Sequence, residues 1–485
     1  MKYSMKFKFF TLLSALVLII GSACNKVNFG EINKDPNRTV EPITSALLTN
    51  VLSGFGNNVW DAGGVRTMGG LYAQYFSETQ YTDASRYSRP NFDFTLYSGV
   101  MYDLQNIINY NSDPATAEKA AVNGSNANQI AIARILKAYY FKMVSDLYGD
   151  IPYSEALKGK GDVVYDTQDA IYPSLLTELK EAIGQFDGGL PFKGDIMYNG
   201  DNAKWKKFAN SLRMLIALQM SKVNPTLGKT EFAAALADAA GSIATNSDNA
   251  SITYAGGNYL NPFYNYYNIT KRDDYAVSKT IIDTLNNYSD PRLNIVGSST
   301  VGFPYGLTRD NAVAFANANT NYARLQNPAW AQPTSAVVVV GAANILLARA
   351  EAAQLGWTGE NATTLYNDGI KASWEQWGVY NAATYATYIA NAKISLATGD
   401  ALRKIATQEW LAWYPNGTQG WNVWRRTGYP NLTPAPGQPN PIPRRIPYGP
   451  GEPQTNPANF ATAAARYTGP DGSNSQFGRI WWDKL

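Results

Sequence analysis

Residues that commonly carry enzyme chemistry are scarce in this chain. It has no histidine and a single cysteine, Cys24, among 485 residues. Catalytic Ser-His-Asp and Cys-His sites are therefore excluded, and a zinc site is disfavoured because imidazole and thiolate are its usual ligands. No metal or cofactor is predicted.

Hydrolytic chemistry in this chain would have to use two carboxylates, as glycoside hydrolases do. The pairs to consider are Asp146 with Asp150 and Asp273 with Asp274. The first pair lies at a predicted helix end, where capping or an arginine partner is the more common role. The second pair consists of sequence neighbours, which do not ordinarily face each other across a substrate. A binding function is therefore favoured over catalysis.

The segment around the lone cysteine is laid out like a secretion signal. Three lysines lie within residues 1–8, a mostly apolar run covers 9–20, and Gly21 to Ala23 are small. As a helix the apolar run would span roughly 18 Å, too short for the roughly 30 Å hydrocarbon core. Cys24 then has two interpretations. It is the lipid-bearing first residue of a mature lipoprotein, although such signals usually have leucine where Gly21 stands, or it is a free thiol beside an ordinary cleavage site.

Charge is balanced in the rest of the chain. The net charge is +3, and three of the 41 basic residues precede Cys24, which leaves 38 basic against 38 acidic residues. Nucleic-acid binding needs a clustered basic excess. No nucleic-acid partner is predicted.

Aromatic residues among polar loop residues are the candidate ligand contacts. A sugar lays its apolar C–H face on an aromatic ring while amides and charged groups bind its hydroxyl rim. Two loop segments, at 57–87 and 256–274, and the stretch "NPAWAQP" have this composition. Packing inside the fold or against a partner protein is the alternative for each ring. The candidates are Trp60, Tyr75, Tyr81, Tyr87, Tyr259, Tyr264, Tyr266, Tyr267, Arg272 and Trp330.

Helical patterns dominate the chain after residue 42 and must position these loops. One helix is predicted in "NQIAIARILKAYYFKMVSDLYGDIP", where apolar residues recur every three or four positions and Gly149 ends the pattern. "WKKFANSLRMLIALQMSKVNP" predicts a second. "SAVVVVGAANILLARAEAAQLGW" predicts a third. It pairs with a following helix that carries Leu365, Tyr366, Ile370 and Trp374, and the pair loosely resembles a tetratricopeptide unit. A plain helix hairpin is the alternative.

Two further segments favour structural roles. "WNVWRRTGYP" offers rings and guanidinium groups that suit an anion or a stacked ligand. The favoured interpretation is that they fix a loop against the helical body. The chain ends in "GRIWWDKL", and two adjacent tryptophans predict a packed C-terminus.

The blocks taken together resemble the SusD/RagB family of outer-membrane lipoproteins, and its SusD-like 2 branch in particular. The resemblance rests on "FGEINKDPN", "LYAQYFSETQYTDASRY", "ILKAYYFKMVSDLYGDIPYSEAL", "WKKFANSLRMLIAL" and "QEWLAWYPNGTQGWNVWRRTGYPNL", in this order over almost the whole mature chain. It implies a mainly α SusD-like fold of tetratricopeptide-like helix pairs with an irregular, loop-rich face. It also implies a signal peptide over 1–23 and one domain over 24–485, of which 24–42 is a tether.

The resemblance further implies what the protein does. Members are held at the outer membrane by lipid on the cysteine that matches Cys24, and they deliver an oligosaccharide, or in some cases a peptide, to a SusC-like TonB-dependent transporter. The expected location is the outer face of the cell, although the acidic residues that favour export are absent after Cys24 until Glu31. A carboxylate-based glycoside hydrolase and a helical-repeat adaptor are the alternatives.

Overall fold

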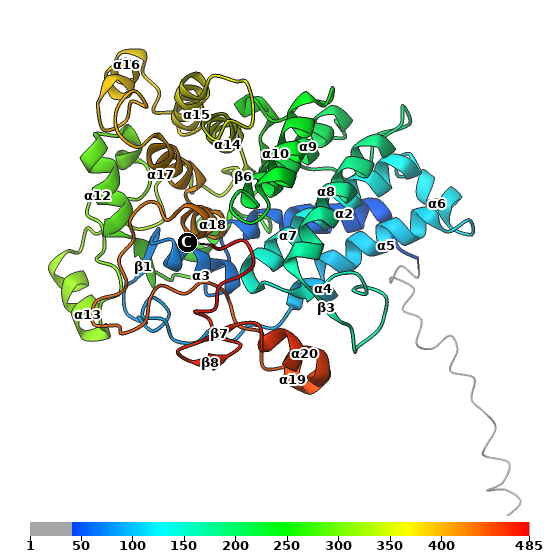
Figure 1. Cartoon of the computed structure of the whole chain (residues 1–485), viewed down its shortest axis with the longest axis horizontal. Helices are drawn as coiled ribbons and strands as arrows, with labels where there is room; N and C mark the ends of the chain where they lie inside the picture. Colours follow the sequence, from blue (N-terminus) through cyan, green and yellow to red (C-terminus); the bar gives the residue numbers. More distant parts are fainter. Residues whose placement is uncertain (1–40, 485) are drawn as a thin grey trace, which may run out of the picture. The chain divides into compact units, whose positions relative to one another are not determined.

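Helices dominate residues 41–484, the part of the chain that the computed structural model describes (Figure 1). The predicted signal peptide, Cys24 and all of the tether except residues 41 and 42 lie outside the described residues. The N-terminal helices are α2 (Thr44–Ser53), α3 (Val65–Tyr72), α4 (Thr95–Ser98), α5 (Val100–Ser112), α6 (Ala117–Ala121), α7 (Asn126–Tyr148), α8 (Gln168–Gln185), α9 (Asn202–Gln219) and α10 (Pro225–Ala237).

The remaining helices follow a loop-rich middle section. They are α11 (Pro262–Tyr264), α12 (Lys279–Tyr288), α13 (Arg309–Ala318), α14 (Ala342–Gln354), α15 (Ala362–Gln376), α16 (Ala382–Ala390), α17 (Ala401–Trp413), α18 (Gly417–Thr427), α19 (Glu452–Thr455) and α20 (Pro457–Ala464). Short 3₁₀ turns are η1 (Phe55–Asn58), η2 (Asn246–Asp248) and η4 (Pro291–Asn294), and η3 (Asn265–Ile269) is a π-helical turn.

Strands are few and form two-stranded antiparallel ribbons. The pairs are β1 (Phe76–Glu78) with β5 (Tyr275–Val277), β2 (Ile151–Pro152) with β3 (Tyr165–Asp166), β4 (Ala250–Ile252) with β6 (Val337–Val340), and β7 (Thr468–Gly469) with β8 (Gly472–Ser473). The first and third ribbons join loop segments that are far apart in the sequence.

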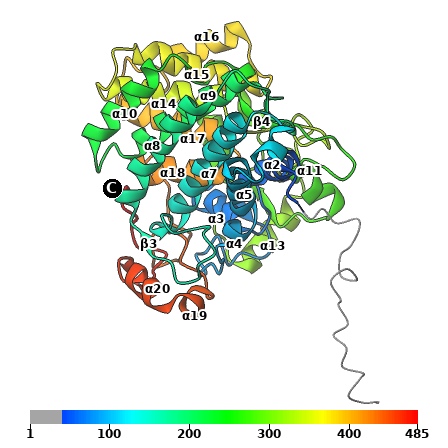
Figure 2. The same ribbon diagram turned by 90° about the vertical axis from the view of Figure 1, so that its right-hand side faces the viewer.

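Neighbouring helices pack as successive pairs. Helix α7 contacts α5 and α8, α9 contacts α8, α10 and α14, and α14 contacts α15 and α17. Figures 1 and 2 show α7, α8, α9, α14 and α15 beside one another. Contacts join residues 44–484 into one unit, and the domain boundaries given above stay a prediction.

Helix α7 confirms the clearest periodic pattern. Its predicted stripe is buried, and Gly149 ends the helix with φ +92°. Helix α7 is buried on more than one face, because Lys142 and Asp146, which lie outside the apolar stripe, are buried as well. The two residues form a buried ion pair, since the Lys142 ammonium lies 2.6 Å from Asp146 Oδ2.

The third predicted helix is wrong in its first part. Residues 337–340 form strand β6 instead, and helix α14 begins at Ala342. Four consecutive valines favour the extended conformation because their branched side chains lose rotamer freedom in a helix. The hairpin that follows, α14 with α15, is confirmed.

Candidate functional site

The β1–β5 ribbon brings together the two loop segments that the sequence predicts as ligand contacts. Phe76 pairs with Val277 and Glu78 with Tyr275. Just beyond the ribbon, the Thr79 amide donates to the carbonyl oxygen of Asp274 at 2.9 Å. Residues 79–81 therefore lie beside residues 272–274, although about 190 positions separate them in the chain.

Tyr81 and Arg272 form the exposed centre of this surface. Tyr81 is 53% exposed, and the Arg272 guanidinium carbon lies 5.9 Å from the centre of its ring. Arg272 Nε donates to Asp274 Oδ2 at 2.7 Å, and Gln80 Nε2 donates to Asp274 Oδ1 at 2.8 Å. Buried Asp274 thus holds a cation beside an open aromatic ring, an arrangement that suits stacking on one face and hydrogen bonding at the edge.

Two further candidates remain accessible. Tyr259 is 60% exposed on a turn whose ends, Gly256 and Tyr259, exchange two backbone hydrogen bonds of 3.0 Å. Tyr264 is half-buried on α11, which begins after Asn261, whose side chain accepts from two backbone amides. We name Tyr81 and Arg272, the exposed pair that the contacts bring together, the loop surface.

Six candidates have their rings covered by protein, which is the packed alternative that the sequence left open for each ring. Trp60 stacks on Phe263 with ring centres 5.3 Å apart. The Tyr267 hydroxyl donates to the carbonyl oxygen of Tyr275 at 2.6 Å. Tyr266 and Tyr267 lie in the π-helical turn η3, and Tyr75 directly precedes strand β1. The six are Trp60, Tyr75, Tyr87, Tyr266, Tyr267 and Trp330.

Trp330 differs from the other five because it lines a pocket. The pocket has a volume of about 250 Å³, and we name it the Trp330 pocket. Its walls include Trp377, Trp413 and Tyr414, and the amides of Asn344 and Gln376 provide polar groups. Sequence reasoning missed Trp377, which directly follows helix α15, and Trp413, which ends α17. An aromatic residue at helical spacing is usually part of the core.

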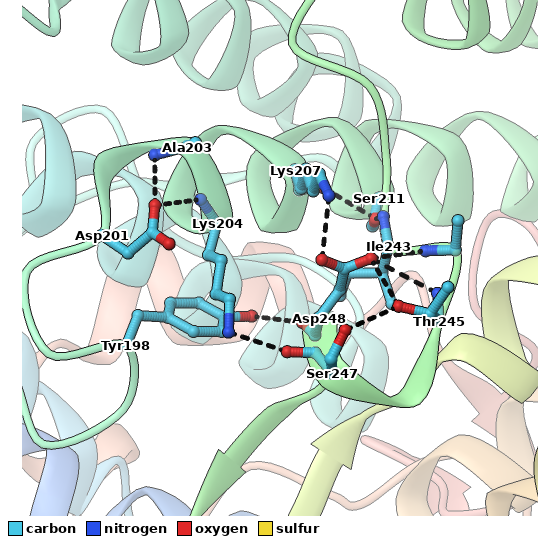
Figure 3. Close-up of polar contacts among 11 residues, drawn as sticks. Tyr198, Asp201, Ala203, Lys204, Lys207, Ser211, Ile243, Thr245, Ser247 and Asp248 are labelled. Carbon is cyan, nitrogen blue, oxygen red and sulfur yellow. Dashed lines mark hydrogen bonds and ion pairs between the residues drawn. The ribbon is translucent and has the colours of Figure 1, made fainter.

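A polar network supports the β4–β6 ribbon that forms part of this pocket (Figure 3). The Lys207 ammonium on α9 lies 2.9 Å from Asp248 Oδ1, and Lys204 Nζ donates to the Ser247 carbonyl oxygen at 2.8 Å. Burial opposes ionisation of Asp248, but hydrogen bonds from Lys207 and from backbone amides lower its pKa. The network anchors η2 to α9 immediately before β4, which pairs with β6 in the pocket wall.

The carboxylate pairs considered for hydrolysis are engaged in structural contacts. Asp146 is fully buried and accepts from Asn422 Nδ2 at 2.7 Å, in addition to its Lys142 partner. Asp150 accepts from the Gln168 amide at 3.0 Å and from Arg466 NH1 at 2.6 Å. These contacts agree with the structural role that the sequence favours for the first pair.

The block at 421–430 has the structural role that was predicted, but residues up to Thr427 belong to helix α18 and not to a loop. The Arg425 guanidinium carbon lies 3.6 Å from the Trp421 ring centre, and Arg425 NH2 donates to the Asp146 carbonyl oxygen at 2.7 Å. Trp482 from the C-terminus covers the other part of this arginine and is fully buried. The predicted packing of the C-terminus is confirmed.

Within residues 41–484, no group of three His, Cys, Asp or Glu side chains is placed to hold a metal ion. No helix in this range combines the length and apolar character needed to cross a bilayer.

Comparison with known proteins identifies the family. The family model SusD-like 2, described as starch-binding and associating with the outer membrane, matches residues 36–449. The chain belongs to the SusD-like 2 family. This confirms the resemblance found in the sequence and the mainly α SusD-like fold of tetratricopeptide-like helix pairs. The chain has no significant match among curated protein sequences.

Solved structures extend the likeness over nearly the whole chain. A chitin-binding protein is 28% identical, with a TM-score of 0.76, and the match covers 91% of this chain and 100% of that one. A SusD homologue from Bacteroides uniformis is 25% identical, with a TM-score of 0.73 and coverage of 90% and 99%. A chitin-binding SusD homologue from Flavobacterium johnsoniae shares the fold at 24% identity and a TM-score of 0.73, with coverage of 90% and 98%.

Proposed function

We propose that this SusD-like protein binds an oligosaccharide at the outer membrane and delivers it to a SusC-like TonB-dependent transporter. Lipid on Cys24 would anchor it, with the loop surface facing outside the cell. The family description, starch-binding and associating with the outer membrane, supports the ligand class and the location. The observation that carries the proposal is the open Tyr81 ring beside Arg272, because an exposed ring with a positioned polar partner suits a sugar.

Binding on the loop surface would follow from the shape of a sugar. Its C–H face would lie on Tyr81, and its hydroxyl rim would accept from Arg272 and Gln80. Asp274 keeps Arg272 in place before the ligand arrives, so little conformational entropy is lost on binding. No bond is broken in this proposal.

Chitin fragments are the first ligands to test. The 28% identical relative is named as a chitin-binding protein, and N-acetylglucosamine units present both an apolar ring face and amide groups. Isothermal titration calorimetry with chitohexaose should give saturable binding and no shorter products after hours of incubation. Steady release of shorter products would instead identify a hydrolase.

Tyr81→Ala is the variant that tests the loop surface. Losing about 60 Å² of apolar contact costs about 1.5 kcal/mol, which is roughly a tenfold weaker affinity. Tyr102→Ala is the matched control, because Tyr102 is 47% exposed on helix α5 and lies outside the loop surface. Equal affinities for the two variants would contradict the assignment of the surface.

Anchoring and delivery need separate measurements. Mass spectrometry of the native protein should find an acylated N-terminal Cys24, and the protein should fractionate with the outer membrane. A large barrel transporter should co-purify with it in detergent. An unmodified cysteine in a protein free of the envelope would contradict the anchor without affecting the ligand assignment.

A further inference from the structure

A second concave site lies away from the loop surface and the Trp330 pocket. It has a volume of about 690 Å³, within the range of small-molecule pockets. Its walls come from α12, from the segment 392–399 that joins α16 to α17, from the first turns of α17, and from residues 429–431 after α18. None of the residues predicted from the sequence as ligand contacts lines it. We name it the α12–α17 pocket.

Positive charge in this pocket exceeds negative charge. Lys393, Arg403 and Lys404 line it, against one carboxylate, Asp283. That carboxylate is already engaged, since the Lys279 ammonium lies 2.5 Å from Asp283 Oδ2. Among residues 41–484, no other acidic side chain lines the pocket, and the nearby Asp400 carboxylate caps α17 by accepting from the Arg403 backbone amide at 3.1 Å.

Neutral acceptors hold two of these cations. Lys404 is only 7% exposed, and its ammonium donates to the carbonyl oxygens of Ala392, Ser395 and Thr398 at 2.7, 2.6 and 2.6 Å. Lys393 Nζ donates to Asn287 Oδ1 at 2.7 Å. A buried ammonium is normally paired with an acid. Here its charge remains uncompensated at the wall of an open pocket.

Arg403 is the cation available to a ligand. Within the described part of the chain, its guanidinium makes no ion pair and no hydrogen bond, and the residue is exposed. Guanidinium binds carboxylate and sulfate through two parallel hydrogen bonds. Arg403 is thus placed to meet an anion that enters the pocket.

Other groups in the pocket suit a sugar ring. Tyr288 and Tyr429 are half-buried and line it, and the side chains of Asn287, Asn431 and Thr284 add amide and hydroxyl groups. Aromatic faces with a few polar groups are the usual composition of a saccharide site.

We propose that the α12–α17 pocket binds an acidic saccharide unit, with its carboxylate or sulfate at Arg403 and Lys393 and its ring against a tyrosine. This site is separate from the loop surface and goes beyond the function proposed for that surface. Its ligand differs in charge from a neutral chitin fragment, so either proposal can fail without the other.

Calorimetry on the whole protein tests the proposal with four probes. Digalacturonic acid and N-acetylglucosamine 6-sulfate carry the two anions, and galactobiose and N-acetylglucosamine are their neutral counterparts. At least one anionic probe should bind about tenfold more tightly than its neutral counterpart, and the probe that does so identifies the anion. The advantage should shrink as salt rises. Equal affinities for charged and neutral probes would overturn the proposal.

Four variants locate the binding site. Arg403→Gln and Lys393→Gln should each remove most of the advantage of the anionic probe. Arg309→Gln is the matched control, because Arg309 is also exposed, lies in the first turn of a helix and has no ion pair among residues 41–484. Tyr81→Ala should leave binding of the anionic probe unchanged. Loss of binding in Tyr81→Ala with no effect of Arg403→Gln would overturn the proposal and assign the anion to the loop surface.

Discussion

Arg426 lies between two buried glutamates, and its removal should destabilise the fold in a pH-dependent way. Arg426 on α18 donates to Glu351 Oε2 on α14 at 2.8 Å and to Glu409 Oε2 on α17 at 2.9 Å. All three residues are no more than 5% exposed. Burial, with the nearby charge of Glu351, raises the pKa of Glu409 well above its usual range. The raised pKa favours the protonated form of Glu409, which leaves one cation to balance one carboxylate.

Arg426→Met keeps much of the side-chain volume but removes that cation. The second glutamate must then take up a proton in the folded state. For a carboxyl group with an ordinary pKa of about 4.3, this costs about 1.36 kcal/mol for each pH unit above that value. We expect a loss of about 3–4 kcal/mol of unfolding free energy at pH 7 and about 1.5 kcal/mol at pH 5.5. The larger figure agrees with the cost of about 3–5 kcal/mol for breaking a buried ion pair.

Urea unfolding followed by tryptophan fluorescence at both pH values measures these losses. Arg134→Met is the matched control, because Arg134 also binds two glutamates, Glu178 at 2.8 Å and Glu181 at 2.6 Å. That cluster is open to solvent, with Glu181 60% exposed, so its loss should be about 1 kcal/mol or less. A loss for Arg426→Met that is equal to the control, or equal at the two pH values, would refute the reasoning.

Two further predictions concern the stability of the scaffold. Burial raises the pKa of Glu78 to about 7, so the folded state binds a proton that the unfolded state has lost, and stability falls as pH rises from about 4.5 to about 7. Glu78→Gln keeps an acceptor for the Ser85 amide. This variant should be about 2–4 kcal/mol more stable than the native protein at pH 8 and equally stable at pH 4.5. Thermal unfolding at both pH values measures the difference. Gly417→Ala should lower the free energy of unfolding by about 2–3 kcal/mol, because the added Cβ would lie 2.2 Å from the Gly70 backbone where α18 crosses α3. Gly184→Ala is the control. It has open space around it and should raise the free energy of unfolding by up to about 1 kcal/mol. Equal urea midpoints for the two glycine variants would show that the α3–α18 contact is not tight.

Helix positions were predictable because they depend on local periodicity. The apolar stripe of α7 and the hairpin of α14 and α15 follow from residues a few positions apart. The block at 421–426 was predicted as a loop fixed on the helical body, and it instead forms part of helix α18. Strand β6 was a further exception. There, four valines favoured an extended ribbon with β4, which lies nearly ninety residues earlier in the chain.

The candidate site was predictable only as two loop segments of suitable composition. The sequence did not predict which aromatic rings are exposed to solvent, because each segment contains both core and surface aromatic residues. Trp60 and Tyr266 belong to the same ring cluster beneath the surface, with centres 5.5 Å apart. Trp377 and Trp413 were missed because a helix-end tryptophan that lines a pocket has the same local sequence as one that fills the core.

The sequence by itself determined which chemistry is open to the protein, because it has no histidine, one cysteine and balanced charge. Its helical periodicity also determined the fold class. Only the tertiary structure decided that Tyr81 meets Arg272, that six other candidates are covered, and that three cations gather around one pocket. The physical reason is the distance along the chain over which each property is set. Composition and periodicity are local properties, whereas exposure and charge compensation depend on which distant segments pack together.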